Sequence, residues 1–129
     1  MHDHHLETIS VPVSDPDRSK DFYREKLGFD VVMDNEFGRG LRWVMLRPPG
    51  GQTAITLVTW FDSMPPGSSQ GLVLSVPDIE EAFAELKQNG VLEEDDRIET
   101  APWGRWVSIS DPDGNGWVVQ QNTSSAEFA

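Results

Sequence analysis

The sequence predicts an α+β fold in which two βαβββ modules form a curved, eight-stranded mixed sheet around a cleft. The main observation is a repeat, because Asp15 recurs as Asp78 at an offset of 63 residues and Gly28 recurs as Gly90 at an offset of 62. In both copies an alternating apolar segment precedes the aspartate, and a helical apolar pattern separates it from the glycine. A unit repeated at half the length of a 129-residue chain indicates a duplicated module. We expect a single domain, residues 1–129, with modules at 6–60 and 70–122 and a linker at 61–69.

The first module begins with a strand whose apolar residues alternate with polar ones. Asp15 and Pro16 are typical of a helix N-cap and a first helical position, and Gly28 is typical of a helix stop. Three segments rich in strand-forming residues follow, separated by turns rich in glycine or proline. We therefore expect strands at residues 6–13, 29–34, 41–47 and 53–59, and a helix at 16–27.

The second module repeats this order after the linker. Asp78 is expected to cap a helix that ends at Gly90, with Glu81 as its capping-box partner. The apolar residues of this helix form one stripe for packing on a sheet: Ile79, Ala82, Phe83 and Leu86. The turn at 111–115 joins the last two strands. We expect strands at residues 70–76, 97–101, 105–110 and 116–121, followed by a frayed segment at 123–129.

Composition limits the classes of function. The chain has 22 acidic and 10 basic residues, for a formal net charge of -12. This charge disfavours nucleic acid partners and favours a cationic small molecule. The absence of cysteine excludes disulfides, thiolate metal sites and cysteine nucleophiles. No apolar run is as long as a membrane span and residues 1–5 do not resemble a signal peptide, so we expect a cytoplasmic protein without membrane contact.

Two motifs carry a resemblance that covers roughly residues 6–122. One reads Val-Pro-Val-Ser-Asp-Pro-Asp-Arg-Ser at 11–19 and continues as Phe-Tyr-Arg-Glu-Lys-Leu-Gly-Phe at 22–29, and the other reads Asp-Pro-Asp-Gly-Asn at 111–115. With the βαβββ order, they resemble the vicinal oxygen chelate superfamily of glyoxalase I, bleomycin-resistance proteins and extradiol dioxygenases. The resemblance implies the curved sheet with its cleft, and a homodimer in which the partner chain completes the cleft in some members.

The resemblance also implies where a metal would be held. Metal-using members of the superfamily bind a divalent ion through side chains on the first, fifth and eighth strands, and the matching positions here are Thr8, Gly71 and Val118. None of the three has an ordinary metal-binding side chain, so we expect no metal cofactor. The alternative, a divalent ion with unusual ligands, requires a register shift or a contribution from residues near these positions: Gln70, Gln120, Glu7, His4 and His5.

Without a metal, binding must rely on aromatic surface and a few polar groups. The sequence contains five tryptophans, and indole faces stack on planar rings and attract cations. The residues predicted to line the cleft are Trp43, Trp60, Trp103 and Trp106, with the polar side chains of Arg42, Thr56, Ser108 and Gln120. Arg105 is a further polar candidate, and Glu99 and Asp34 are the acids best placed for a general base.

These observations support two main hypotheses about function. The first is a non-catalytic protein that binds a small molecule, with cationic aromatic compounds among the candidates, in an aromatic cleft without a metal, as in bleomycin-resistance proteins. The second is a metal-dependent lyase, isomerase or dioxygenase of the same superfamily with non-standard ligands. All three histidines lie within the first five residues, so the sequence contains no Ser-His-Asp arrangement on a folded core. A duplicated fold that serves protein interaction is a third possibility.

Overall fold

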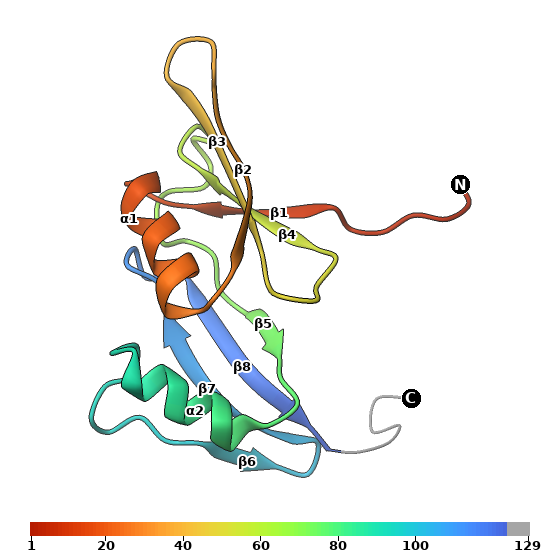
Figure 1. The fold of residues 1–129 in the computed structure, drawn as a ribbon, viewed down its shortest axis with the longest axis vertical. Coiled ribbons are helices and arrows are strands. Elements are labelled where there is room, and N and C mark those ends of the chain that lie inside the picture. Colours follow the sequence, from red (N-terminus) through yellow and green to blue (C-terminus); the bar gives the residue numbers. More distant parts are fainter. Residues whose placement is uncertain (124–129) are drawn as a thin grey trace. The chain divides into compact units, whose positions relative to one another are not determined.

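The computed structural model describes residues 1–123, and its strands and helices follow the predicted order (Figure 1). The chain divides into two compact units. The first comprises residues 1–69 with the loop 111–115, and the second comprises residues 70–110 with those from 116 onward. Each unit contains one four-stranded sheet. The predicted α+β class with two repeated modules is confirmed.

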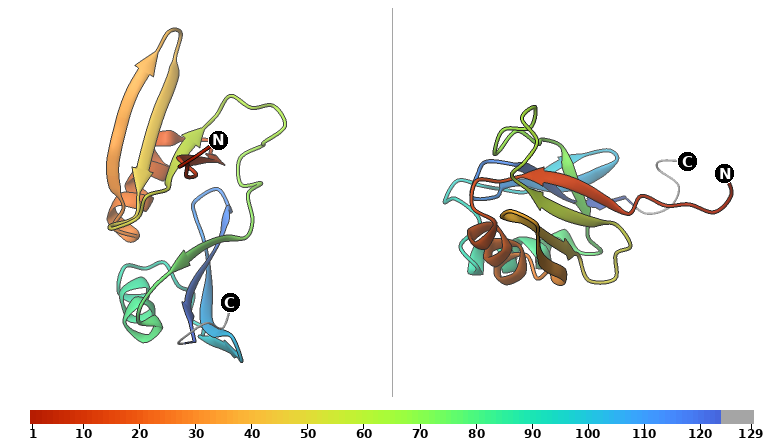
Figure 2. Two further views of the ribbon diagram at one scale, coloured as in Figure 1. Left: turned by 90° about the vertical axis from the view of Figure 1, so that its right-hand side faces the viewer. Right: turned by 90° about the horizontal axis from the view of Figure 1, so that it is seen from above.

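The sheet of the first unit has the strand order β1-β4-β3-β2. β1 and β4 are parallel, and the other neighbouring strands are antiparallel. β3 pairs with β4 only at Val44–Leu46, whereas its pairing with β2 continues to the Phe37–Leu41 pair. The β2–β3 hairpin therefore extends beyond the rest of the sheet (Figures 1 and 2). The four strands are β1 (Thr8–Pro12), β2 (Asp30–Phe37), β3 (Leu41–Arg47) and β4 (Ala54–Val58).

The helical segment of the first unit packs on β3 and β4. α1 (Pro16–Asp21) is capped by Asp15, as the sequence predicts. The Asp15 side chain accepts hydrogen bonds from the backbone N–H groups of Asp17 and Arg18. The single predicted helix at 16–27 is wrong in one respect. Its second half, η1 (Phe22–Lys26), is a π-helical turn. Tyr23 in this turn is fully buried, and its hydroxyl donates to Asp111 at 2.7 Å, a distant partner that local helix patterns do not encode.

The predicted turn at 111–115 also anchors the first unit. Asp111 accepts hydrogen bonds from the backbone N–H groups of Asp113 and Asn115. The Asn115 amide, fully buried, donates to the Asp111 carboxylate and to the Pro12 carbonyl, both at 2.8 Å. Since these polar groups satisfy one another, the loop fixes the end of β1 without leaving a buried donor unpaired among them.

The second unit has the strand order β5-β8-β7-β6. β5 and β8 are parallel, and the remaining pairs are antiparallel. α2 (Ile79–Gln88) is capped by the predicted Asp78 and packs on β7 and β8 through buried Ile79 and Leu86. No described helix in either unit is long and apolar enough to cross a membrane. The strands are β5 (Leu72–Ser75), β6 (Glu99–Ala101), β7 (Gly104–Ser110) and β8 (Gly116–Asn122).

Two details differ from the sequence prediction, and a third prediction lies almost wholly outside the described residues. The eight strands hydrogen-bond as two four-stranded sheets, because every strand pair lies within one repeat. β2 continues to Phe37, beyond the strand end expected at residue 34, so the turn before β3 is limited to the residues around Gly38 and Gly40, both with positive φ. The predicted frayed segment lies outside the described residues except for Thr123, whose N–H donates to the Trp103 carbonyl.

Candidate functional site

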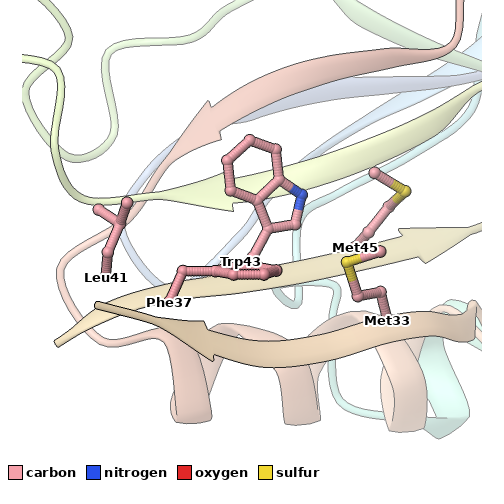
Figure 3. Close-up of a pocket in the computed structure, with 5 residues that line it drawn as sticks. All are labelled: Met33, Phe37, Leu41, Trp43 and Met45. Atoms are coloured by element: carbon pink, nitrogen blue, oxygen red, sulfur yellow. The ribbon is translucent and has the colours of Figure 1, made fainter. Parts of the chain in front are cut away.

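The β2–β3 hairpin carries an apolar pocket on one face. Its volume is about 430 Å³, and its lining residues are Met33, Phe37, Leu41, Trp43 and Met45. Figure 3 shows the Trp43 indole standing off the strands between Leu41 and the two methionines, whose side chains lie near each other. The two exposed members at the hairpin tip are Phe37 and Leu41, which are 48% and 37% exposed. The pocket is therefore open toward the tip of the hairpin.

Strand alternation explains why these residues share a face. Leu41, Trp43 and Met45 are alternate residues of β3, so their side chains point the same way. A bulge between Val31 and Met33 shifts the register of β2, after which Met33 pairs with Met45. The bulge therefore places Met33 and Phe37 of β2 on the same face as the lining residues of β3.

The pocket is part of a longer aromatic cluster in the first unit. Trp43 contacts Phe37 edge to face with ring centroids 6.1 Å apart, and it stacks on Trp60 at 5.4 Å and 27°. Trp60 in turn contacts Phe61 at 5.8 Å. The structure thus brings together two predicted tryptophans, Trp43 and Trp60, although β4 and most of β3 separate them in sequence.

The opposite face of the same hairpin carries an ion-pair network, which we call the Asp34 network. Arg42 donates to both oxygens of Asp34, through Nε at 3.0 Å and Nη2 at 2.9 Å, and through Nη1 to Asp17 of α1 at 2.6 Å. Lys20 of α1 donates to Asp34 at 2.6 Å. The hydrogen bond from Arg42, followed by that from Lys20, holds the pKa of Asp34 well below its usual range. The bond to Asp34 is also the largest cause that raises the pKa of Arg42.

The network changes the interpretation of two predicted site residues. Arg42 was predicted to contact ligand beside Trp43, but adjacent strand residues face opposite sides. Its guanidinium is committed to Asp34 and Asp17 on the side of α1. Asp34, a predicted general-base candidate, is a paired carboxylate with a lowered pKa, so it has little tendency to accept a proton near neutral pH.

The position that resembles a first-strand metal ligand takes part in a neutral hydrogen bond. Thr8 and Thr56 join their hydroxyl oxygens at 2.7 Å, and Thr56 is only 2% exposed. Thr56 therefore lies beneath the exposed surface, where its hydroxyl group already has a partner. Gly71 has a φ of +79° and contributes no side chain, and Val118 is aliphatic.

The histidines that are candidate metal ligands lie in the exposed N-terminal segment. His4 contacts the His2 carbonyl at 2.6 Å, and His5 contacts the Glu7 carboxylate at 3.1 Å, all in the exposed N-terminal segment. Within residues 1–123, no three His, Cys, Asp or Glu side chains form a group that could hold a metal ion. The donors present do not fit a divalent metal, which requires three or four converging N or O ligands.

The remaining predicted residues lie on one face of the sheet in the second unit. Trp106 of β7 pairs in register with Gln120 of β8, and Trp103 stacks on Trp106 with centroids 4.8 Å apart and planes 10° apart. Ser108 pairs with Val118 on the same face. Trp103 is 40% exposed. We call this surface the tryptophan face. It combines the stacked indoles of Trp103 and Trp106 with the hydroxyl of Ser108 and the amide of Gln120.

Four candidates in the second unit differ in their surroundings. Arg105 alternates with Trp106 and forms an ion pair with Glu80 of α2, so it faces the helix. Glu99 pairs in register with Trp106, so it lies on the tryptophan face, exposed at the edge of the sheet. Gln120 donates to the Asn122 side chain at 2.6 Å, and Gln70 lies before β5 in an exposed position.

Comparison with known proteins identifies the family. The sequence profile of the glyoxalase/bleomycin resistance protein/dioxygenase superfamily matches residues 4–119. The chain belongs to this superfamily. It is 34% identical over 119 residues to the uncharacterized protein YetH of Bacillus subtilis, a match that covers 88% of this chain and 95% of YetH.

Solved structures of superfamily members are similar in both fold and sequence. TnmS3, an antibiotic binding protein from Streptomyces sp. CB03234, matches with a TM-score of 0.87 and 42% identity, covering 95% of this chain and 99% of TnmS3. A superfamily member from Sphaerobacter thermophilus matches with a TM-score of 0.83 and 34% identity, covering 94% and 99% of the two chains. The family resemblance stated from the motifs is therefore confirmed.

Proposed function

We propose that this protein binds a small, planar aromatic molecule in the β2–β3 pocket, without a metal ion and without transforming it. The observation that carries the proposal is the lining, because five apolar side chains surround about 430 Å³. Such a surface holds a ligand through apolar burial and ring contacts. Since none of these side chains is an acid, a base or an activated nucleophile, the pocket itself offers no group for a reaction.

The size and composition of the pocket suit a ring system. Sites for small molecules typically enclose about 300–1,000 Å³, and this pocket lies within that range. Trp43 offers an indole held in place by Trp60. Met33 and Met45 have flexible, polarizable thioethers that adapt to rings of different outline. We infer a ligand with a rigid aromatic body.

The net charge bears on the approach of the ligand. A formal charge of -12 attracts cations and repels anions at long range. A cationic ligand also gains roughly 0.5–2 kcal/mol over an indole face. Neutral and cationic aromatic compounds are therefore favoured over anionic ones.

The relatives support an antibiotic as the class of ligand. TnmS3 is described as an antibiotic binding protein, and we infer that this chain similarly sequesters an aromatic antibiotic.

From the superfamily resemblance we also propose a homodimer, which sedimentation equilibrium tests. The tryptophan face of the second unit, which carries Trp103 and Trp106, is the alternative location for the site.

The rival function is a metal-dependent lyase, isomerase or dioxygenase. That chemistry needs converging N or O donors with an open position for substrate. Thr8 is bonded to Thr56 instead, and the described residues 1–123 supply no group of acids and histidines for a metal. No step through a metal is therefore proposed.

The test is a tryptophan-fluorescence titration with two planar probes, neutral 2-acetylnaphthalene and cationic proflavine. The protein is first dialysed against EDTA. We expect saturable quenching in the dialysed wild type, no gain on adding Zn²⁺ or Mn²⁺, and Kd raised about tenfold by Trp43→Ala, the loss of one ring contact of about 1.4 kcal/mol.

Trp103→Ala is the matched control, because it removes an exposed indole from the other unit. An affinity that falls in Trp103→Ala but not in Trp43→Ala would move the site to the tryptophan face. Binding that appears only after metal addition would overturn the proposal in favour of the rival.

A further inference from the structure

We propose that Arg47 binds an oxygen acceptor on the ligand, and that the ligand is therefore an aromatic compound with a carbonyl group. This inference rests on the proposed function of the β2–β3 pocket and adds the polar chemistry that the apolar lining lacks. It gives a role to a residue that neither the motifs nor the tryptophan pattern singles out.

The position of Arg47 follows from strand alternation. Leu41, Trp43 and Met45 line the pocket from alternate positions of β3, and Arg47 is the next residue of the same series. It therefore lies on the pocket face, roughly 7 Å along the strand from Met45 at two residues of rise. A ligand that covers Met45 and extends away from the hairpin tip meets the guanidinium next.

One donor of Arg47, its Nε–H, is also unpaired within the described part of the chain. The Nε atom is buried and has no hydrogen-bond partner among residues 1–123. Asp30 lies opposite Arg47 in the register of β2 and β3, yet no ion pair joins them. By contrast, Arg42 in the same strand is fully engaged with carboxylates. A buried donor without an acceptor is rare in folded proteins, and a ligand oxygen near the guanidinium would supply one.

The neighbouring polar groups on this face do not compete for that role. Thr56 pairs in register with Met45, so its hydroxyl is the polar group nearest the inner end of the pocket. That hydroxyl is buried and bonded to Thr8 at 2.7 Å. The two threonines thus satisfy each other, and Arg47 is the next residue on this face of β3 whose side chain offers donors beyond Met45.

Guanidinium chemistry defines the ligand group. Arg presents several N–H donors in a fixed plane and accepts nothing, so its partner must be an acceptor oxygen. A carbonyl and a carboxylate share this property. The formal net charge of -12 disfavours the approach of an anion, so we commit to the neutral carbonyl.

The test compares three probes with the same ring system: 2-ethylnaphthalene, 2-acetylnaphthalene and naphthalene-2-carboxylate. Each is titrated into wild type, Arg47→Met and the control Arg97→Met, which removes the same charge from an exposed position in the second unit. Wild type should bind the ketone about tenfold to a hundredfold more tightly than the ethyl compound, the range expected for a hydrogen bond to a charged group. Arg47→Met should bind 2-ethylnaphthalene as tightly as wild type does but should no longer prefer 2-acetylnaphthalene. Arg97→Met should keep the preference of wild type for 2-acetylnaphthalene.

The outcomes separate the two proposals. If 2-ethylnaphthalene binds wild type as tightly as the ketone, or if the ratio survives in Arg47→Met, Arg47 does not recognise the acceptor, whereas the pocket itself stands. If the carboxylate alone shows the Arg47-dependent gain, the commitment to a carbonyl is wrong. If no naphthalene binds wild type, the proposed function falls and takes this inference with it. Should Arg47→Met fail to fold, Arg47→Gln keeps a polar side chain but removes the charge, so the preference for the ketone should fall to the smaller value of a neutral hydrogen bond.

Discussion

Removal of the Asp34 charge tests how the pocket is held in place. Asp34 and Arg42 lie behind the pocket on the hairpin and connect it to α1 through Lys20 and Asp17. Asp34→Asn keeps the size of the side chain but removes its charge. The new amide also presents donors to groups that already donate, so the hydrogen bonds of the network are weakened together.

The expected cost follows from the burial of the network. The side chains of Asp34, Lys20 and Arg42 are 24%, 26% and 27% exposed. Exposed pairs contribute about 0.2–1 kcal/mol, and breaking a fully buried pair costs about 3–5 kcal/mol. The pairs that Asp34 forms with Lys20 and Arg42 are about three-quarters buried and lie between these limits, so Asp34→Asn should lower the free energy of unfolding by about 2 kcal/mol at pH 7.

The pH dependence has a definite sign. The folded state lowers the pKa of Asp34 far below its usual value, so the folded protein binds fewer protons here than the unfolded chain. The stabilisation is therefore fully present above an unfolded pKa of about 4 and is lost as the pH falls toward the lowered folded value. The difference between wild type and Asp34→Asn should be constant from about pH 5 to 8 and shrink below about pH 4.

Urea unfolding at a series of pH values measures both effects. Asp21→Asn is the control, because Asp21 forms an exposed pair with Arg24 within the helical segment, and it should cost less than about 0.5 kcal/mol. A loss from Asp34→Asn no larger than that of the control would show that the Asp34 network adds no more stability than an exposed ion pair. A difference that grows as the pH falls would contradict the lowered pKa of Asp34.

Three other substitutions test the supports of the first unit by urea unfolding. Tyr23→Phe should cost about 1–2 kcal/mol, since it removes the buried hydrogen bond to Asp111; an unchanged stability would contradict that bond. Gly67→Ala should cost more than about 2 kcal/mol, because Gly67 has a φ of +81° and a Cβ there would lie 2.1 Å from the Asp113 carbonyl oxygen. Thr8→Val should cost about 1 kcal/mol by leaving a buried hydroxyl without its partner, and a neutral effect would show that the pair is not needed.

The parts of the fold that depend on local chemistry were predictable from the sequence. Asp15 and Asp78 cap their helices as expected because an N-cap bond needs only the next two or three residues. The π-helical turn at Phe22–Lys26 was not predicted, since the hydroxyl of its buried Tyr23 bonds to a residue 88 positions away. Patterns of local periodicity contain no information about such a partner.

The candidate site was predictable only in part. The aromatic ring of Trp43 marks it as a candidate in the sequence, but a strand expected to end at residue 34 leaves Phe37 outside β2 and therefore outside the predicted site. Alternation from Trp43 along β3 was the signal that would have found Leu41 and Met45, and it would have assigned Arg42 to the other face. The register of β2 could not be read in this way, since it depends on a bulge after Val31.

The central claim is that the apolar β2–β3 pocket binds an aromatic molecule without a metal. The most direct measurement is a titration of EDTA-dialysed protein with 2-acetylnaphthalene by isothermal calorimetry, with wild type and Trp43→Ala compared at equal concentration. Wild type should bind the ligand saturably, the Kd of Trp43→Ala should be about tenfold higher, and neither value should change when Zn²⁺ is restored. Equal affinities for the two proteins, or heat that appears only with the metal, would contradict the claim.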